Sequence, residues 1–366
     1  MHNNKLTSIL GAAAMCGLLM STSASAAMKL GKADLKSAGA LAFGDKGVLF
    51  VGDSVGAKVF ALETGDVKKL AVPVAVEITG INQKVAALLG TAPDQILIND
   101  VIVNPASKNV WMSVSRGRGP EATPAIVSAD ATGKLTLLTL DNIRHDSVDL
   151  PNPPAVDNSN PRAAARRQET ITDLHFIGHG KLIVAGLSNE EFSSTLRSIP
   201  YPFSEATPGA GIEIYHGNHG RFETNAPVRT FVPYEINKQQ HILAAYTCTP
   251  LVKIPVSELT PGNKVKGTTI AELGNRNRPI DMIVYRKDGK EYILMANSSR
   301  GVMKLPTAGI EGYSAITEKV EDKKGVPYET IEALKGVQQL DKLDDNRAVM
   351  LVDDAGSLNI RTVALP

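Results

Sequence analysis

The side chains best suited to chemistry follow six short apolar runs along the chain. Each run ends in polar residues, and together these supply carboxylates, amides, guanidinium groups and one thiol. Around a concave mouth, such groups can hold a small polar ligand or a metal ion. Asp, Asn and Ser also end strands for reasons of turn chemistry alone, so a structural role is the alternative. The predicted ligand-binding ring is Asp53, Arg116, Asn189, Cys248, Asn297, Arg300 and Asp353.

The strands that must position this ring recur as a sequence repeat. In residues 39–62, GALAFGDKGVLFVGDSVGAKVFAL, an apolar strand, a tight turn, a second apolar strand and a third strand follow one another. The second strands recur as VLFVG, NVWMSV, KLIVAG, ILAAY, YILMAN and AVMLV, which are nearly continuous apolar runs typical of strands buried on both faces. Their spacing of roughly 45 to 75 residues suits four-stranded blades with insertions. The pattern predicts an all-β fold, a β-propeller, and favours it over a pair of β-sandwiches.

Six blades agree best with the number of repeats. The last copy supplies three strands before the chain stops at Pro366, which would leave an open edge. We expect the N-terminal strand of the mature chain, within AMKLGKADLKS (27–37), to close the ring there. A seventh blade is the alternative, because residues 226–240 are long for a simple connection.

At the level of these strand-turn-strand repeats, the chain resembles the broad class of secreted bacterial propellers of the YVTN, NHL and SMP-30/gluconolactonase-like type. The resemblance implies a propeller over most of residues 37–366. For gluconolactonase-like members it implies a divalent metal ion in the central funnel, held by acidic and amide side chains. That ligand set has no residue-by-residue match in this sequence.

The first 26 residues have the features of a signal peptide. One basic residue, Lys5, precedes an apolar run too short to span a bilayer, and ASA at 24–26 suits a signal peptidase. We therefore expect a periplasmic or secreted protein that starts at Ala27 and does not insert into the membrane. Its 38 basic and 38 acidic residues would balance, which indicates no nucleic-acid partner. Cys248 would be its sole cysteine.

Long loops are expected on one face of the ring, where binding residues tend to lie. The insertion at 188–210 carries apolar side chains that an exposed loop would not keep without a place to bury them. We predict that Arg197, Tyr201 and Phe203 belong to a lid over the funnel, with packing on a neighbouring blade as the alternative. Residues 148–168, rich in Pro, Asn and Arg, have the composition of a solvated linker.

The histidines and the cysteine are expected to be structural. His175 with His179, and His216 with His219, suggest zinc or copper, but we place both pairs at turns on the face with short loops. No third ligand lies nearby in sequence. Cys248 is expected to be buried as a small apolar residue, with a reactive thiol or a soft metal ligand as the alternative.

Two hypotheses for function follow. The first is an exported binding propeller that holds a small molecule or a protein on its long-loop face. The second is a metal-dependent hydrolase of lactonase or esterase type, with one divalent ion on Asp53, Asn189, Asn297 and Asp353. Motif searches find no GxSxG, HExxH, P-loop, GxGxxG, CxxCH or EF-hand pattern, so the catalytic residues and cofactor stay unknown.

Overall fold

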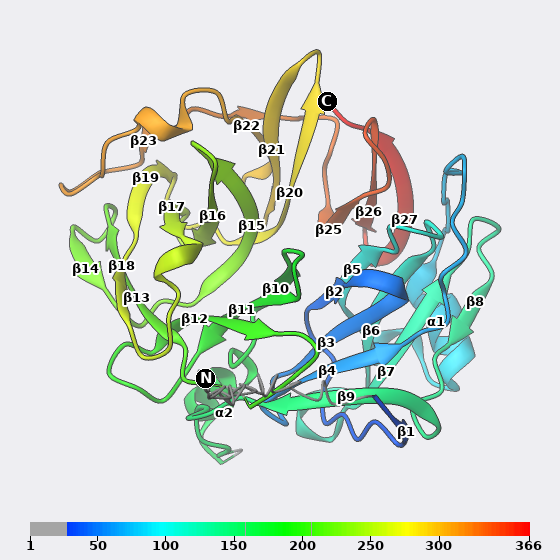
Figure 1. Cartoon of the computed structure of the whole chain (residues 1–366). Coiled ribbons are helices and arrows are strands. Elements are labelled where there is room, and N and C mark those ends of the chain that lie inside the picture. Colours follow the sequence, from blue (N-terminus) through cyan, green and yellow to red (C-terminus); the bar gives the residue numbers. More distant parts are fainter. Residues whose placement is uncertain (1–27, 158, 206) are drawn as a thin grey trace, which may run out of the picture.

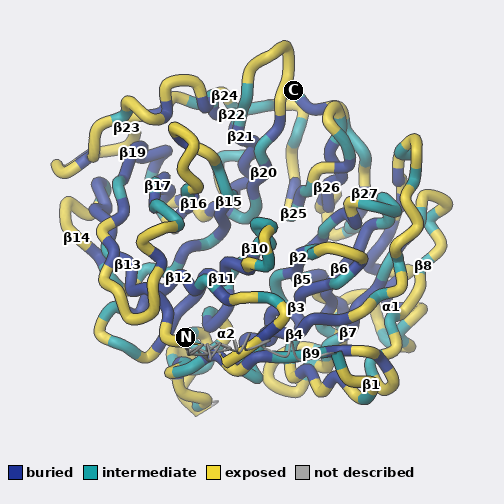
Figure 2. Tube along the Cα trace, in the orientation of Figure 1, coloured by how far each residue is buried: buried dark blue, intermediate teal, exposed yellow. Residues whose placement is uncertain are grey.

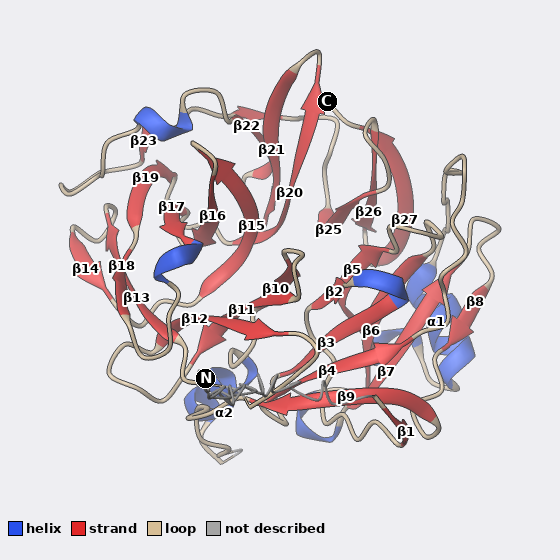
Figure 3. Cartoon of the chain, viewed as in Figure 1, coloured by secondary structure: helices blue, strands red, loops and turns tan. Residues whose placement is uncertain are grey.

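Six sheets surround a central axis and confirm the prediction of an all-β, six-bladed propeller (Figure 1). The computed structural model describes residues 28–366 except 158 and 206, and the predicted signal peptide, 1–26, lies outside this part. Figure 3 shows strands forming the blades, with the helical segments confined to the connections. Among the described helices, none has the length and apolar character needed to cross a bilayer.

The first two blades share strands in an order that differs from the chain. From the axis outward, the first blade contains β2 (Leu41–Phe43), β3 (Val48–Asp53), β4 (Lys58–Glu63), β9 (Ile143–Asp149) and β1 (Lys29–Gly31). The second blade contains β5 (Ile96–Val103), β6 (Val110–Arg116), β7 (Thr123–Ala129) and β8 (Leu135–Leu137). The chain therefore completes the second blade before it returns to the first and adds β9.

The remaining blades follow the chain more simply. The third contains β10 (Asp173–Phe176), β11 (Lys181–Leu187), β12 (Ser194–Pro200), β13 (Ala210–His216) and β14 (Arg221–Glu223), with β18 (Lys264–Lys266) parallel to β13. The fourth contains β15 (Val228–Ile236), β16 (Gln239–Tyr246), β17 (Pro250–Pro255), β19 (Thr268–Leu273) and β23 (Lys323–Gly325). The fifth contains β20 (Pro279–Lys287), β21 (Lys290–Asn297), β22 (Gly301–Pro306) and β24 (Glu329–Thr330). The sixth contains β25 (Val337–Lys342), β26 (Arg347–Asp354) and β27 (Ser357–Ala364). The segment 226–240, considered for a seventh blade, holds β15, the inner strand of the fourth.

The first two blades are exchanged in the ring, whereas the third to sixth follow one another in chain order. Strand β5 contacts both β25 and β2, and β2 also contacts β10. The second blade therefore lies between the sixth and the first, and the first lies next to the third (Figure 1).

The ring is closed by the connection between the first two blades, and the expectation that the N-terminal strand closes it was wrong. Ile78 and Ile360 exchange two backbone hydrogen bonds of 2.9 Å, which adds an edge segment to the sixth blade. Helix α1 (Ile81–Leu89) follows directly and packs between the sixth and second blades. Strand β1 pairs with β9 instead, because β9 offers it a free edge on the first blade.

The core lies between the blades. The second strands are buried on both faces, as their apolar runs predict, and Leu49, Phe50 and Val51 are each 0% exposed. Figure 2 shows buried residues within the blades and exposed residues in the outer connections. Packing of this kind fixes the inner strands, and therefore the side chains that line the axis.

Candidate ligand site in the central funnel

Inner strands of four blades carry an aspartate that bonds to a neighbouring blade. In each pair one carboxylate oxygen accepts a backbone N–H across the junction. The pairs are Asp100 with Leu41 (2.7 Å), Asp173 with Phe231 (2.8 Å), Asp281 with Leu340 (2.9 Å) and Asp341 with Val103 (2.7 Å). The other oxygen accepts the N–H of the residue that follows the aspartate. These carboxyl groups therefore hold the ring together around its axis.

The position of these aspartates changes their protonation. Burial in the channel raises the pKa of Asp100 to about 7 and that of Asp173 to about 7. Burial, and then the neighbouring Asp100, also raise the pKa of Asp281 well above its usual value. The channel therefore contains carboxyl groups that take up protons more readily than ordinary aspartates.

A cavity of about 770 Å³ opens above these aspartates and forms the funnel. Asn99 and Thr172, each directly before an inner-strand aspartate, line it together with Ala40 of the first blade. Helix α2 (Pro161–Gln168) forms part of its wall through Ala164 and Arg167. A concave site of this volume suits a small molecule.

Helix α2 occupies the last eight residues of the segment 148–168, for which a solvated linker was expected. Asn160 caps the helix by accepting a hydrogen bond from the Arg162 N–H at 3.0 Å, and Pro161 takes the first helical position. The Arg167 guanidinium fixes the helix to the ring with bonds to the carbonyl oxygens of Val55 (2.7 Å) and Pro154 (2.7 Å). The Asn-Pro pair was a helix-start signal in the sequence.

Cations dominate the charged side chains of the funnel. The cationic lining residues are Lys36, Arg118, Arg167, Arg229 and Arg278, and the carboxylate among the described lining residues is Glu169. Glu169 is already paired with Arg229 at 2.6 Å, and Arg229 also donates to the Thr247 hydroxyl at 2.9 Å. The funnel therefore presents an excess of positive charge, although the whole sequence is nearly balanced.

Arg278 is the cation with the most capacity for a ligand. Its guanidinium makes no hydrogen bond or ion pair to any residue that the structure describes, whereas Arg118, Arg167 and Arg229 each bond to protein oxygens. Partial burial, and then the neighbouring Arg229, lower the pKa of Arg278. An anion placed between the two guanidinium groups would remove this repulsion.

The predicted ring residues do not line this funnel. Asp53 is buried and accepts backbone N–H bonds from Lys36 (2.8 Å), Ser37 (2.9 Å) and Gly56 (2.8 Å). Asp353 accepts from the Gly356 N–H at 2.7 Å in the corresponding turn of the sixth blade. These two carboxylates organise turns because the second strands that carry them lie one strand away from the axis.

The other ring residues lie on four blades, and among them Asn297 and Arg300 lie together at the turn between β21 and β22 of the fifth blade. Asn297 is buried and donates to the carbonyls of Met295 and Gly301, and Arg300 donates to Asp322 at 2.9 Å. Arg116 is exposed and donates to the Gly90 carbonyl, and Asn189 is exposed. The four metal ligands of the hydrolase hypothesis, Asp53, Asn189, Asn297 and Asp353, thus come from four blades, and three of them are engaged in their own turns.

The predicted lid is part of a blade. Arg197 lies within β12 and is 2% exposed, and its Nη1 donates to Thr195. Tyr201 and Phe203 pack against Phe50 of the first blade, with ring centroids 4.9 and 6.0 Å from that of Phe50. The apolar side chains of 188–210 are thus buried by packing on a neighbouring blade, which was the alternative considered for them.

The two histidine pairs have different surroundings. His175 lies in β10 near Asp173, and burial lowers its pKa to about 4. His216 and His219 lie in the turn after β13, which is on the same face as the end of β16, and the expected face was wrong. The structure brings Cys248 to them, although it is 29 residues beyond His219 in the sequence.

Comparisons with solved structures return proteins of low sequence identity and low TM-score. A glucose dehydrogenase is 13% identical, with a TM-score of 0.37, over 93% of this chain and 99% of that chain. The PQQ-bound form of aldose sugar dehydrogenase from Streptomyces coelicolor is 11% identical, with a TM-score of 0.33, over 92% and 97%. The apo-form of soluble aldose sugar dehydrogenase from Escherichia coli is 14% identical, with a TM-score of 0.30, over 92% and 99%. No family model matches the chain, and no curated protein matches its sequence.

Proposed function

We propose that the protein is an exported binding propeller that holds a small anionic molecule in its central funnel. The observation that carries the proposal is the unpaired guanidinium of Arg278 next to Arg229, in a cavity whose described carboxylate, Glu169, is already paired. A cavity of about 770 Å³ favours a small molecule over a protein partner. Carboxylate, phosphate and sulfate groups match guanidinium geometry well.

The experiment is a calorimetric binding screen with small carboxylates, phosphates and sulfates, each beside an uncharged analogue of similar size. The Arg278→Gln variant removes the charge and keeps a side chain of similar polarity. Because a hydrogen bond to a charged group is worth about 1.5–3 kcal/mol, we expect it to weaken binding by roughly 10- to 100-fold. The matched control is Arg286→Gln, because Arg286 is an exposed arginine of β20, the strand that begins directly after Arg278, and it is paired with Glu291 outside the funnel.

Equal binding of charged and uncharged analogues, or equal affinity of Arg278→Gln and Arg286→Gln, would contradict the proposal. Export belongs to the same proposal. It is tested by fractionating the native host and sequencing the N-terminus of the mature protein, which is expected to begin at Ala27.

A further inference from the structure

Three side chains with nitrogen and sulfur donors meet at the junction of the third and fourth blades. His216 and His219 come from the turn after β13, and Cys248 follows β16. One donor atom from each lies within 4.8 Å of the other two. Within the part of the chain that the structure describes, no other group of three His, Cys, Asp or Glu side chains is gathered in this way.

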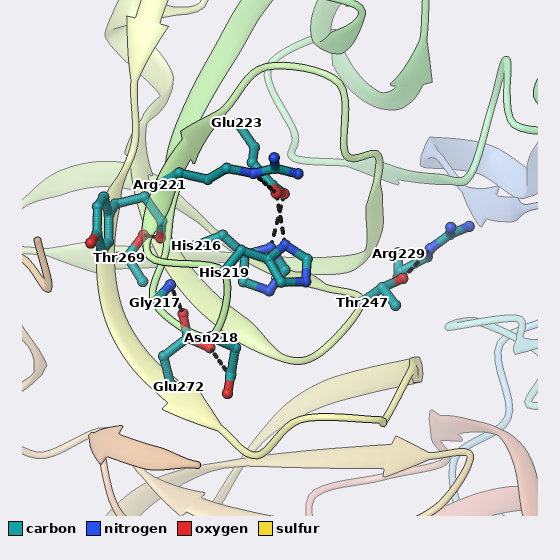
Figure 4. Close-up of polar contacts among 11 residues, drawn as sticks. His216, Gly217, Asn218, His219, Arg221, Glu223, Arg229, Thr247, Thr269 and Glu272 are labelled. Carbon is teal, nitrogen blue, oxygen red and sulfur yellow. Dashed lines mark hydrogen bonds and ion pairs between the residues drawn. The ribbon is translucent and has the colours of Figure 1, made fainter. Parts of the chain in front are cut away.

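One carboxylate orients both imidazole rings. Glu223 approaches His216 Nδ1 with Oε2 at 2.9 Å and His219 Nδ1 with Oε1 at 2.7 Å (Figure 4). Arg221 Nε donates to the same Oε1 at 3.1 Å, which favours the ionised form of this buried carboxylate. Because an ionised carboxylate only accepts hydrogen bonds, each Nδ1 carries the proton. In the neutral imidazole each Nε2 therefore presents a lone pair.

The Nε2 atom of His216 is buried and has no hydrogen-bond partner among the described residues. The side chain of His216 is 3% exposed, so water does not satisfy this atom freely. An unpaired buried acceptor costs about 1–3 kcal/mol, which a bound cation would recover. The ring of His219 lies alongside, with its centroid 3.8 Å from that of His216.

We propose that His216, His219 and Cys248 bind a transition-metal ion, Zn²⁺ or Cu²⁺, through two Nε2 atoms and the thiolate. Both ions accept imidazole and thiolate ligands. Tetrahedral coordination needs donors about 3.3–3.6 Å apart. One nitrogen of each histidine and the Cys248 Sγ already lie within 4.8 Å of one another. Glu223 supplies the carboxylate–histidine contact that accompanies metal-bound histidines.

The backbone around the donors is held in place without a metal ion. Glu272 accepts hydrogen bonds from the Gly217 N–H at 2.5 Å and the Asn218 side chain at 2.8 Å, which fixes the turn between the two histidines (Figure 4). The Cys248 N–H donates to the Asn277 carbonyl at 2.7 Å. A preformed site of this kind loses little conformational entropy on binding.

The metal site lies beside the funnel but is distinct from it. Thr247, which precedes Cys248, accepts the hydrogen bond from Arg229 that lines the funnel. Neither histidine nor Cys248 lines the funnel cavity. The site can therefore be tested without knowledge of the funnel ligand.

The test is metal binding by the mature protein after treatment with a chelator. Zn²⁺, Cu²⁺ and Co²⁺ are titrated separately, with calorimetry and elemental analysis for stoichiometry and absorption spectra for Co²⁺. We expect one ion per chain and a thiolate-to-cobalt charge-transfer band. Cys248→Ser should abolish the band, and His219→Ala should weaken Zn²⁺ binding by at least 100-fold. Glu223→Gln should weaken it by about 10- to 100-fold while keeping the band.

The control variant is His179→Ala, which removes an exposed histidine on the opposite face and should bind as the native protein does. Thermal unfolding of each metal-free variant checks that it is folded. Absence of stoichiometric binding by the native protein would overturn the proposal. Binding that survives unchanged in Cys248→Ser and His219→Ala would also overturn it.

Discussion

The carboxylate of Asp173 accepts a hydrogen bond from the backbone N–H of Phe231, 2.8 Å away, and so ties the third blade to the fourth. Asp100 and Asp281 make the same kind of bond at two other junctions. At the junction of the first and third blades, the Ser54 hydroxyl makes the contact instead. It donates a hydrogen bond to the Ile171 carbonyl oxygen and accepts one from the Ile171 N–H. The stability of the ring therefore depends on groups that titrate.

We expect the free energy of unfolding to decrease as the pH rises, because Asp173 loses its stabilising proton. Asp173 has a pKa of about 7 in the folded protein, against 3.8 for an ordinary aspartate, so the folded state holds its proton more tightly. Its stabilising contribution is complete below about pH 4 and is lost as the pH rises to about 7, an effect of up to about 4 kcal/mol. Urea unfolding of Asp173→Asn across this range should show a weaker pH dependence than the native protein.

The control for this measurement is Asp288→Asn, which changes an exposed aspartate in the hairpin between β20 and β21. It should retain the pH dependence of the native protein. If Asp173→Asn and Asp288→Asn show the same dependence, Asp173 does not carry the proton.

A second prediction concerns ring closure at the sixth blade. The buried side chain of Asn359 accepts the Gly80 N–H at 2.9 Å, beside the backbone bonds of Ile78. Asn359→Ala leaves that N–H unpaired, so we expect the free energy of unfolding to fall by about 1–3 kcal/mol. Chemical denaturation measures it, with the exposed Asn346→Ala as control. An equal, small change in both variants would mean that the Asn359 side chain does not stabilise the closed ring through Gly80.

The fold was largely predictable from the sequence because each blade has a local signature. The apolar second strands and their turns recur in six copies, and the structure has six blades. The sequence has no such local signature for the exchanged positions of the first two blades or for the closure of the ring at Ile78. Pairing of Ile78 with Ile360 joins segments far apart in the chain, and neither segment carries a residue type that identifies its partner.

The lining of the funnel was less predictable, because the predicted ring lies at the ends of the second strands and the funnel is lined from other segments. Ends of second strands gave Asp53 and Asp353, which serve turns, whereas the axis is lined from the first strands. A signal was present there: an aspartate recurs in NDVIV, TDLHF, IDMIV and LDKL. The approach of Cys248 to His216 had no such signal, since it arises between two blades.

Gly186 gives a further prediction. A Cβ atom at this position in β11 would overlap the carbonyl oxygen of Thr170, and backbone atoms cannot move away cheaply. We expect Gly186→Ala to lower the free energy of unfolding by about 1–3 kcal/mol. Gly312→Ala is the control, because a Cβ atom there meets nothing within 4 Å. Denaturation curves that coincide for the two variants would contradict this close approach.

The last prediction concerns helix α2, which has no buried residue and depends on Arg167 for its attachment. Removing this guanidinium in Arg167→Ala breaks its bonds to Val55 and Pro154. Hydrogen exchange of amides in the helix should then become at least tenfold faster, while exchange in the blade strands stays as it was. Arg162→Ala is the matched control on the same helix, because Arg162 is exposed and its side chain bonds to no described residue. If both variants exchange alike, contacts other than those of the Arg167 guanidinium hold the helix on the ring.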